Sequence, residues 1–204
     1  MRPPSSEPRR PKGRGGSDGF SLIELLVVLA IAGVVLALTT PVISGSQDAG
    51  DGAAAARHLA SVFRRARQEA LVEGRHVGVV FDPVPSGWGI RLCRDGNRNG
   101  LSRSEIADGI DHCDGPPDTV RGWFPRADIG RAVDVPGPGG DTREAVVAFG
   151  TARLASFSPS GTSSSGSVTI RTRSGRHWAV RVAGVTGRVR VLRFDTRTRV
   201  WLDA

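Results

Sequence analysis

Residues 19–38 read GFSLIELLVVLAIAGVVLAL, an almost continuous apolar stretch that is interrupted only by Ser21 and Glu24. As an α-helix rising about 1.5 Å per residue, this stretch reaches roughly 28 Å, close to the ~30 Å hydrocarbon thickness of a bilayer. A carboxylate at the centre of a membrane-spanning helix costs about 2.5–3.5 kcal/mol, and somewhat less near an end. An explanation of this segment must therefore account for its apolar length and for the acid inside it.

Two ordinary explanations account for only part of this pattern. A secretory signal peptide also places an apolar run after a basic region, but its apolar run is shorter and uncharged, and it ends in a small-x-small cleavage site that is not clear here. A simple membrane anchor explains the length of the segment and leaves the cost of Glu24 unexplained. Neither class of segment explains both features.

Gly19 followed by Phe20, with the acid Glu24 as the fifth residue from Phe20, resembles the class III signal of type IV pilins and type II secretion pseudopilins. The resemblance implies that a prepilin peptidase cuts between Gly19 and Phe20 and that the new amino terminus of Phe20 is methylated. It also implies that Glu24 neutralises the amino terminus of a neighbouring subunit during assembly. A membrane-anchored protein outside any filament remains the alternative if Gly19 is not cut.

The first part of the chain supports one orientation in the membrane. Residues 1–19 are rich in Pro, Gly, Ser and Arg and carry a net charge of +3, which predicts a disordered, cleaved leader on the cytoplasmic side. Residues 20–40 are then the transmembrane half of a long helix. We expect a single-pass protein of the bacterial inner membrane, with its C-terminal domain in the periplasm.

Residues 41–74 form the amphipathic half of the predicted helix. Leu59, Phe63, Ala66 and Ala70 recur at helical spacing on one face. The arginines around them are interpreted as a solvated face. Glycines at positions 45, 50 and 52 predict a weak or broken stretch between the membrane half and this half.

From Arg75 onward the hydrophobic period changes to two, which predicts strands. Many short strands after one long helix favour an α+β fold with antiparallel sheet and one β-rich domain over 75–204. Residues 115–142, with their Pro and Gly clusters, are interpreted as a variable loop. The strands are expected at 77–81, 88–92, 145–149, 152–157, 168–173, 177–182 and 188–193.

Four further motifs occur along the chain: RRARQEA at 64–70, GRHV at 74–77, FSPSG at 157–161 and GRVR at 187–190. With these motifs, the chain from Gly19 onward is similar to the GspH/FimT branch of the pseudopilins. That branch has a type IV pilin-like fold, which packs an N-terminal helix on a β-rich domain of two sheets.

The region after the second predicted strand carries a metal-like motif. Asp95, Asn97 and Asn99 resemble the first half of an EF-hand calcium loop, but the last ligand position holds Ile106, and Glu105 lies one place early. A polar turn is therefore favoured over calcium.

Two cysteines, Cys93 and Cys113, bracket this loop. In an oxidising periplasm they predict a disulfide that holds the loop, while a zinc site that adds His112 lacks a fourth ligand at useful spacing.

No catalytic constellation is found. The four histidines are scattered through the sequence, and neither a nucleophile elbow nor a phosphate-binding glycine loop follows a strand. We expect a structural subunit rather than an enzyme, without a cofactor. Its partners would be other pseudopilins or minor pilins, the prepilin peptidase and the inner membrane.

The C-terminal region suggests a second function. Residues 165–204 hold nine arginines against two acids, a net charge of +7, and several arginines alternate with apolar residues along the predicted strands. In FimT-like minor pilins a Gly-Arg-x-Arg motif near the C-terminus is associated with DNA binding, and 187–190 match it. The leading prediction is a type II secretion minor pseudopilin at or near the pseudopilus tip, and the alternative is a DNA-binding minor pilin. The candidate DNA-binding residues are Arg171, Arg173, Arg181, Arg188 and Arg190.

Overall fold

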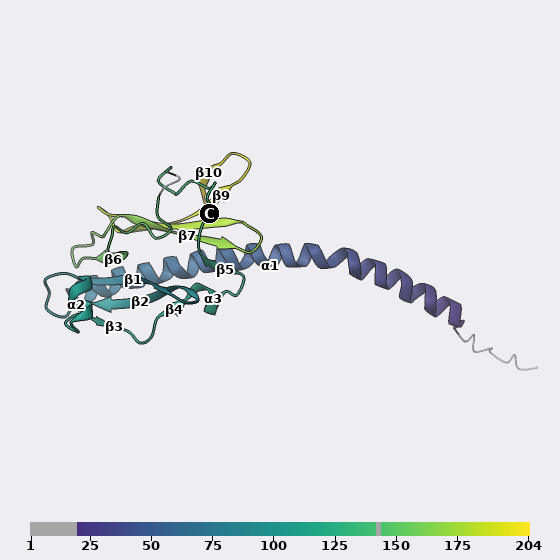
Figure 1. The fold of residues 1–204 in the computed structure, drawn as a ribbon, viewed down its shortest axis with the longest axis horizontal. Helices are drawn as coiled ribbons and strands as arrows, with labels where there is room; N and C mark the ends of the chain where they lie inside the picture. The colour runs from purple at the N-terminus through teal and green to yellow at the C-terminus, as the bar shows by residue number, and fades with distance from the viewer. Residues whose placement is uncertain (1–19, 142–143) are drawn as a thin grey trace, which may run out of the picture. The chain divides into compact units, whose positions relative to one another are not determined.

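The computed structural model describes residues 20–141 and 144–204, except that the side chains of 37–46 lie outside the description. The chain divides into two units, Met1–Val42 and Ile43–Ala204. A single helix, α1 (Leu22–Glu73), contributes to both units. The second unit is the β-rich domain (Figure 1).

The domain part of α1 lies between two sheets (Figure 1). Its buried residues cover more than one stripe of the helix, because both sides of it face a sheet. Most of them are alanines, whose small side chains let both sheets approach the helix closely. The fully buried positions are Ala55, Ala56, Leu59, Ala60, Phe63, Ala66 and Ala70.

The first sheet, sheet A, is antiparallel with the order β3-β2-β1-β6, and β4 also pairs with β2. Val79 of β1 lies opposite Leu92 of β2, and Val77 lies opposite Phe157 of β6. The strands are β1 (Val77–Val84), β2 (Gly87–Arg94), β3 (His112–Cys113), β4 (Asp118–Thr119) and β6 (Leu154–Phe157). The short helix α2 (Arg103–Ala107) lies between β2 and β3 of this sheet, and α3 (Val120–Trp123) leads from β4 to the second sheet.

The second sheet, sheet B, has the order β10-β9-β8-β7-β5, and every pair in it is antiparallel. Val168, Val180 and Val182 are buried on the face that packs toward α1. The strands are β5 (Ala127–Ile129), β7 (Gly166–Thr172), β8 (His177–Ala183), β9 (Arg188–Asp195) and β10 (Val200–Asp203).

An aromatic cluster joins α1 to sheet A. The ring centroid of Phe63 lies 5.7–6.2 Å from those of Phe149, Phe81 and Phe157. Phe63, Phe81 and Phe157 are fully buried. The predicted helical face and the predicted alternating strands therefore meet in one core.

The predicted break in the helix is wrong, because α1 continues through Gly50 and Gly52. A Cβ built at Gly52 would lie 2.3 Å from the ring of Trp178, so glycine here permits close packing of the helix on sheet B. Asp48 and Asp51 also fix this part of α1, because they accept hydrogen bonds from the backbone N–H groups of Ser174 and Arg126. Tertiary packing thus overrides the weak helix propensity of glycine.

Other differences concern short elements. Residues 115–142 are not one irregular loop, since they hold β4, α3 and β5. The predicted strand at 145–149 is limited to one bridge between Val147 and Val168, and β10 was not predicted. Strands of two to four residues contain too few alternations to be recognised from hydrophobic period alone.

We predict that Phe63→Ala destabilises the domain by about 3–5 kcal/mol, because it removes the ring at the centre of a close-packed cluster. Denaturant unfolding of the purified full-length chain in detergent, followed by tryptophan fluorescence, measures the change. Val72→Ala on the same helix, where the side chain is 85% exposed, should change stability by less than about 0.5 kcal/mol. Equal losses in the two variants would contradict the assigned core.

Candidate functional site

The N-terminal unit presents an uncovered apolar helix. All described side chains from Phe20 to Leu36 are exposed, and Phe20 itself is 83% exposed. Glu24 lies in the first turn of α1, where a carboxylate interacts favourably with the positive end of the helix dipole. A contiguous exposed apolar surface of this kind is typical of a membrane or protein interaction site.

The membrane segment itself is not established by this geometry. Within the described residues, no helix is both long enough and apolar enough to cross a membrane. Gly19, and with it the cleavage site, lies outside the described residues, as do the side chains of 37–40. The predicted cleavage and the predicted span over 20–40 stay predictions.

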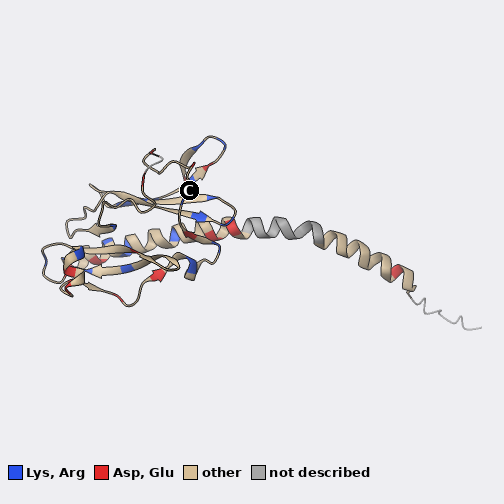
Figure 2. Cartoon of the chain, viewed as in Figure 1, with Lys and Arg blue, Asp and Glu red and all other residues tan. Residues whose placement is uncertain are grey.

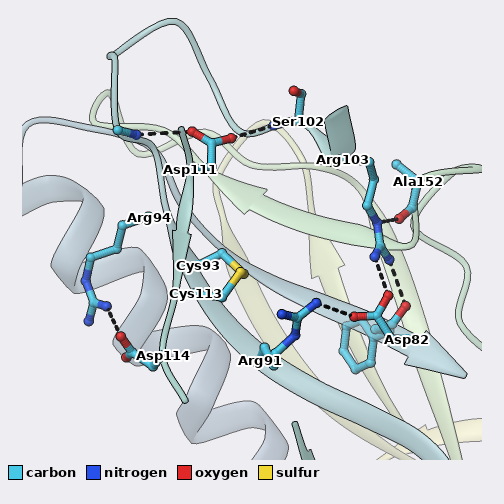
Figure 3. Close-up of a disulfide and its surroundings, with 12 residues drawn as sticks. Asp82, Arg91, Cys93, Arg94, Ser102, Arg103, Asp111, Cys113, Asp114 and Ala152 are labelled. Carbon is cyan, nitrogen blue, oxygen red and sulfur yellow. Dashed lines mark hydrogen bonds and ion pairs between the residues drawn. A yellow bond between two sulfur atoms is a disulfide. The ribbon is translucent and has the colours of Figure 1, made fainter. Parts of the chain in front are cut away.

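The predicted disulfide is confirmed. Cys93 of β2 pairs with Cys113 of β3, 20 residues later, and the two lie opposite each other in sheet A. Arg94, the next residue in β2, pairs with Asp114 at 2.5 Å (Figure 3). It also pairs with Glu69 of α1 at 2.7 Å. The disulfide and these ion pairs hold the ends of the intervening loop against the domain.

Inside that loop, two buried carboxylates organise the backbone. Asp95 accepts hydrogen bonds from the N–H groups of Asn97, Arg98 and Gly100 at 2.6–3.1 Å. Burial by itself raises the pKa of Asp95, but these N–H groups outweigh burial and hold its pKa below the usual value. Asp111 accepts from the N–H of Ser102 at 3.0 Å (Figure 3).

The polar side chains of the calcium-like motif form hydrogen bonds within the loop. The side-chain amides of Asn97 and Asn99 both donate to the same oxygen of Glu105, at 2.9 and 2.7 Å. Among the described residues, no group of three or more His, Cys, Asp or Glu side chains is placed to hold a metal. The arrangement is consistent with the favoured polar turn, and calcium binding stays a hypothesis.

The structure does not bring the five candidate DNA-binding arginines together. Arg171 pairs across the strands with His177 at the start of β8, and Arg188 pairs with Ala183 at its end. Six residue steps of strand, about 20 Å, separate these two pairs. Arg171 and Arg188 therefore lie at opposite ends of sheet B.

Two of the candidates between these ends already have partners. Arg190 forms an ion pair with Asp203 of β10, with Nε and Oδ1 3.0 Å apart. Arg181 donates to the carbonyl oxygen of Pro138 at 3.3 Å. By contrast, Arg171, Arg173 and Arg188 form no side-chain hydrogen bond or ion pair within the part of the chain that the structure describes.

Described residues of the connection after β5, among them Ala132, Pro136 and Pro138, contact the outer face of sheet B. Thr169, His177 and Ala179 are buried on that face. The backbone N–H of Ala132 donates to Nε2 of His177 at 3.1 Å. Burial lowers the pKa of His177, which favours the neutral ring that can accept this bond.

This cover was missed at the sequence level. Leu192 and Phe194 lie on the same face of β9 as Arg188 and Arg190, because strand residues alternate between faces. Leu192 and Phe194 are buried. Apolar residues at supposedly solvated positions are the signal that something covers that face.

Comparison with known proteins agrees with this geometry. Residues 14–40 match the prokaryotic N-terminal methylation motif. Together with one long N-terminal helix and antiparallel sheets, this match defines a pilin-type protein. Residues 55–187 match the family described as Type II transport protein GspH, and the chain belongs to that family.

A relative in Thermus thermophilus, described as the pilin-like protein PilA1, is 41% identical over 81 residues. The match covers 39% of the chain and 51% of the relative, so it spans about half the relative's length. No solved structure matches the chain.

Removing the disulfide should destabilise the domain. A double variant Cys93→Ser/Cys113→Ser opens a loop of about twenty residues and should lose roughly 3 kcal/mol in the chain-entropy model. Denaturant unfolding of the oxidised wild type and the variant measures the difference. A thiol assay on the unfolded wild type without reductant should find no reactive thiol, and two reactive thiols with unchanged stability would contradict the assignment.

Proposed function

We propose that this chain is a minor pseudopilin of the type II secretion system, a structural subunit at or near the tip of the periplasmic pseudopilus. The observation that carries the proposal is the uncovered apolar helix from Phe20, with Glu24 in its first turn. Membership of the GspH family and the methylation motif support it. The compact second unit would then be the part that meets other subunits outside the membrane.

Assembly follows from the chemistry of the helix. Cleavage after Gly19 by the prepilin peptidase would give Phe20 a charged amino group at the start of an apolar segment. An unpaired carboxylate in such surroundings costs about 2.5–3.5 kcal/mol at the bilayer centre. Pairing Glu24 with the amino terminus of a neighbouring subunit removes two uncompensated charges together, so Glu24 would set the position of one helix against the next.

The disulfide fits the proposed compartment. Disulfides persist in the periplasm and are rare in the bacterial cytoplasm. Cys93 and Cys113 both belong to the second unit. This unit would therefore lie on the periplasmic side of the inner membrane, with the N-terminal leader on the other side.

A DNA-binding minor pilin is the second candidate. Its support is a recess of about 250 Å³ at the β5 edge of sheet B, which the unpaired Arg171 and Arg173 line. The same recess also contains Asp128, and Arg121 is already paired with it at 2.7 Å. The positive charge of the basic strands is thus partly neutralised within the chain. The secretion role is therefore favoured over DNA binding.

Glu24→Gln should leave the protein processed and stable but exclude it from filaments, because the amide keeps the size of the side chain and loses its charge. Immunoblots of membrane and sheared-filament fractions measure the fraction assembled, which we expect to fall at least about tenfold. Glu24→Asp, which keeps the charge on a shorter side chain, should retain part of the assembly. Normal incorporation of the Gln variant would refute the assigned role.

A further inference from the structure

Three arginines gather at the other end of sheet B from Arg171, where the turn between β8 and β9 approaches α1. A cavity of about 430 Å³ separates the helix from this turn. The side of the helix that faces it had been interpreted as solvated. The cavity is lined by Arg64, Arg67 and Gln68 of α1 and by Thr186, Gly187 and Arg188 of the turn and β9.

Glycine turns hold the guanidinium of Arg67 in place. Gly187 adopts a φ of +60°, and a Cβ there would lie 2.7 Å from Nε of Arg67 and 2.8 Å from the carbonyl oxygen of Gly161. Gly161, with a φ of +87°, lies on the other side, where a Cβ would be 3.7 Å from an Arg67 terminal nitrogen. The first residue of the Gly-Arg-Val-Arg motif therefore provides the space in which Arg67 of the helix lies.

Part of this guanidinium has no partner among the described residues. Nε of Arg67 is buried and has no hydrogen-bond partner among the described residues. Arg64 and Arg188 likewise form no side-chain hydrogen bond or ion pair in the described part of the chain. A buried polar group without a protein partner is costly unless it binds an ordered water, and otherwise it indicates strain or a missing ligand.

The charge of the cavity indicates the ligand class. None of the described residues that line it is acidic, so three positive charges surround one small space without a counter-charge. Figure 2 shows basic and acidic residues interspersed along the strands and helices of the domain. A cluster of three arginines without an acidic residue beside it departs from this pattern. Guanidinium groups bind carboxylates and phosphates through paired N–H donors, and such charge-assisted bonds are among the stronger ones in proteins.

The geometry favours a single carboxylate over a nucleic acid. DNA binding draws its affinity from several phosphate contacts along a strand. The arginines that could extend the cluster along the strands are engaged, Arg190 by Asp203 and Arg181 by the carbonyl of Pro138. What is left is one recess in which an acidic side chain can be surrounded by Arg64, Arg67 and Arg188.

We propose that the cavity between α1 and the β8–β9 turn receives an aspartate or glutamate carboxylate of a neighbouring filament subunit. The inference rests on the proposed function, since that function supplies the neighbour. Arg67 forms the floor of the site, and Arg64 and Arg188 flank its opening. The contact would fix one periplasmic domain against the next, separately from the pairing of Glu24 in the membrane.

The test measures binding of a fluorescent oligoglutamate peptide to the purified full-length chain in detergent, beside oligothymidylate of equal charge. The peptide should bind, and Arg67→Gln and Arg188→Gln should each weaken it about tenfold, the usual scale for one charge-assisted contact. Arg190→Gln is the matched control, because that arginine belongs to the same motif but is paired with Asp203, and it should change binding by less than about twofold. Arg188 is exposed at the start of β9, so its variant keeps the test valid if Arg67→Gln fails to fold.

Two results would overturn the proposal. The first is peptide binding that does not change in Arg67→Gln and Arg188→Gln. The second is oligothymidylate that binds more tightly than the peptide and is lost in the same variants, which would make this a nucleic-acid site. Both results leave the outcome of the Glu24→Gln assembly experiment unchanged, so failure of the carboxylate site and failure of the proposed filament assembly can be told apart.

Discussion

The packing of one alanine-rich helix between two antiparallel sheets is the constraint on which the domain depends. Alanines at 55, 56, 60, 66 and 70 let both sheets reach the helix, and Phe63 fills the space toward sheet A. Gly52 extends the same principle to the contact with Trp178. Because the helix is fixed in this way, Arg64 and Arg67 lie beside the β8–β9 turn. Glu69 of the same helix forms an ion pair with Arg94 of β2.

Helix α1 carries two kinds of apolar surface. In the second unit its apolar side chains are covered by the sheets of the same chain, whereas the described side chains of 20–36 are all exposed. The first surface makes the domain stable, and in the proposed filament the second would be covered by lipid or by other helices. Under that proposal, one continuous helix would serve both a folded domain and an assembly.

The period of the hydrophobic residues predicted the helices and strands that are long enough to show a repeating pattern. The helical face through Leu59 and Phe63 and the main strands of both sheets were expected, and the pair Cys93–Cys113 followed from compartment and position. The arrangement of the arginines could not be predicted, because the partners of Arg181 and Arg190 come from segments far along the chain or in an unpredicted strand. Alternation assigns a residue to a face but does not show what covers that face.

The intact mass of the protein purified from membranes tests the central claim most directly, because the proposed filament assembly depends on the proposed cleavage after Gly19. The account predicts a chain that begins at Phe20, carries one methyl group on its amino terminus, and has lost two hydrogens to the Cys93–Cys113 disulfide. A chain that still contains residues 1–19, or one cut elsewhere with an unmethylated amino terminus, would contradict it.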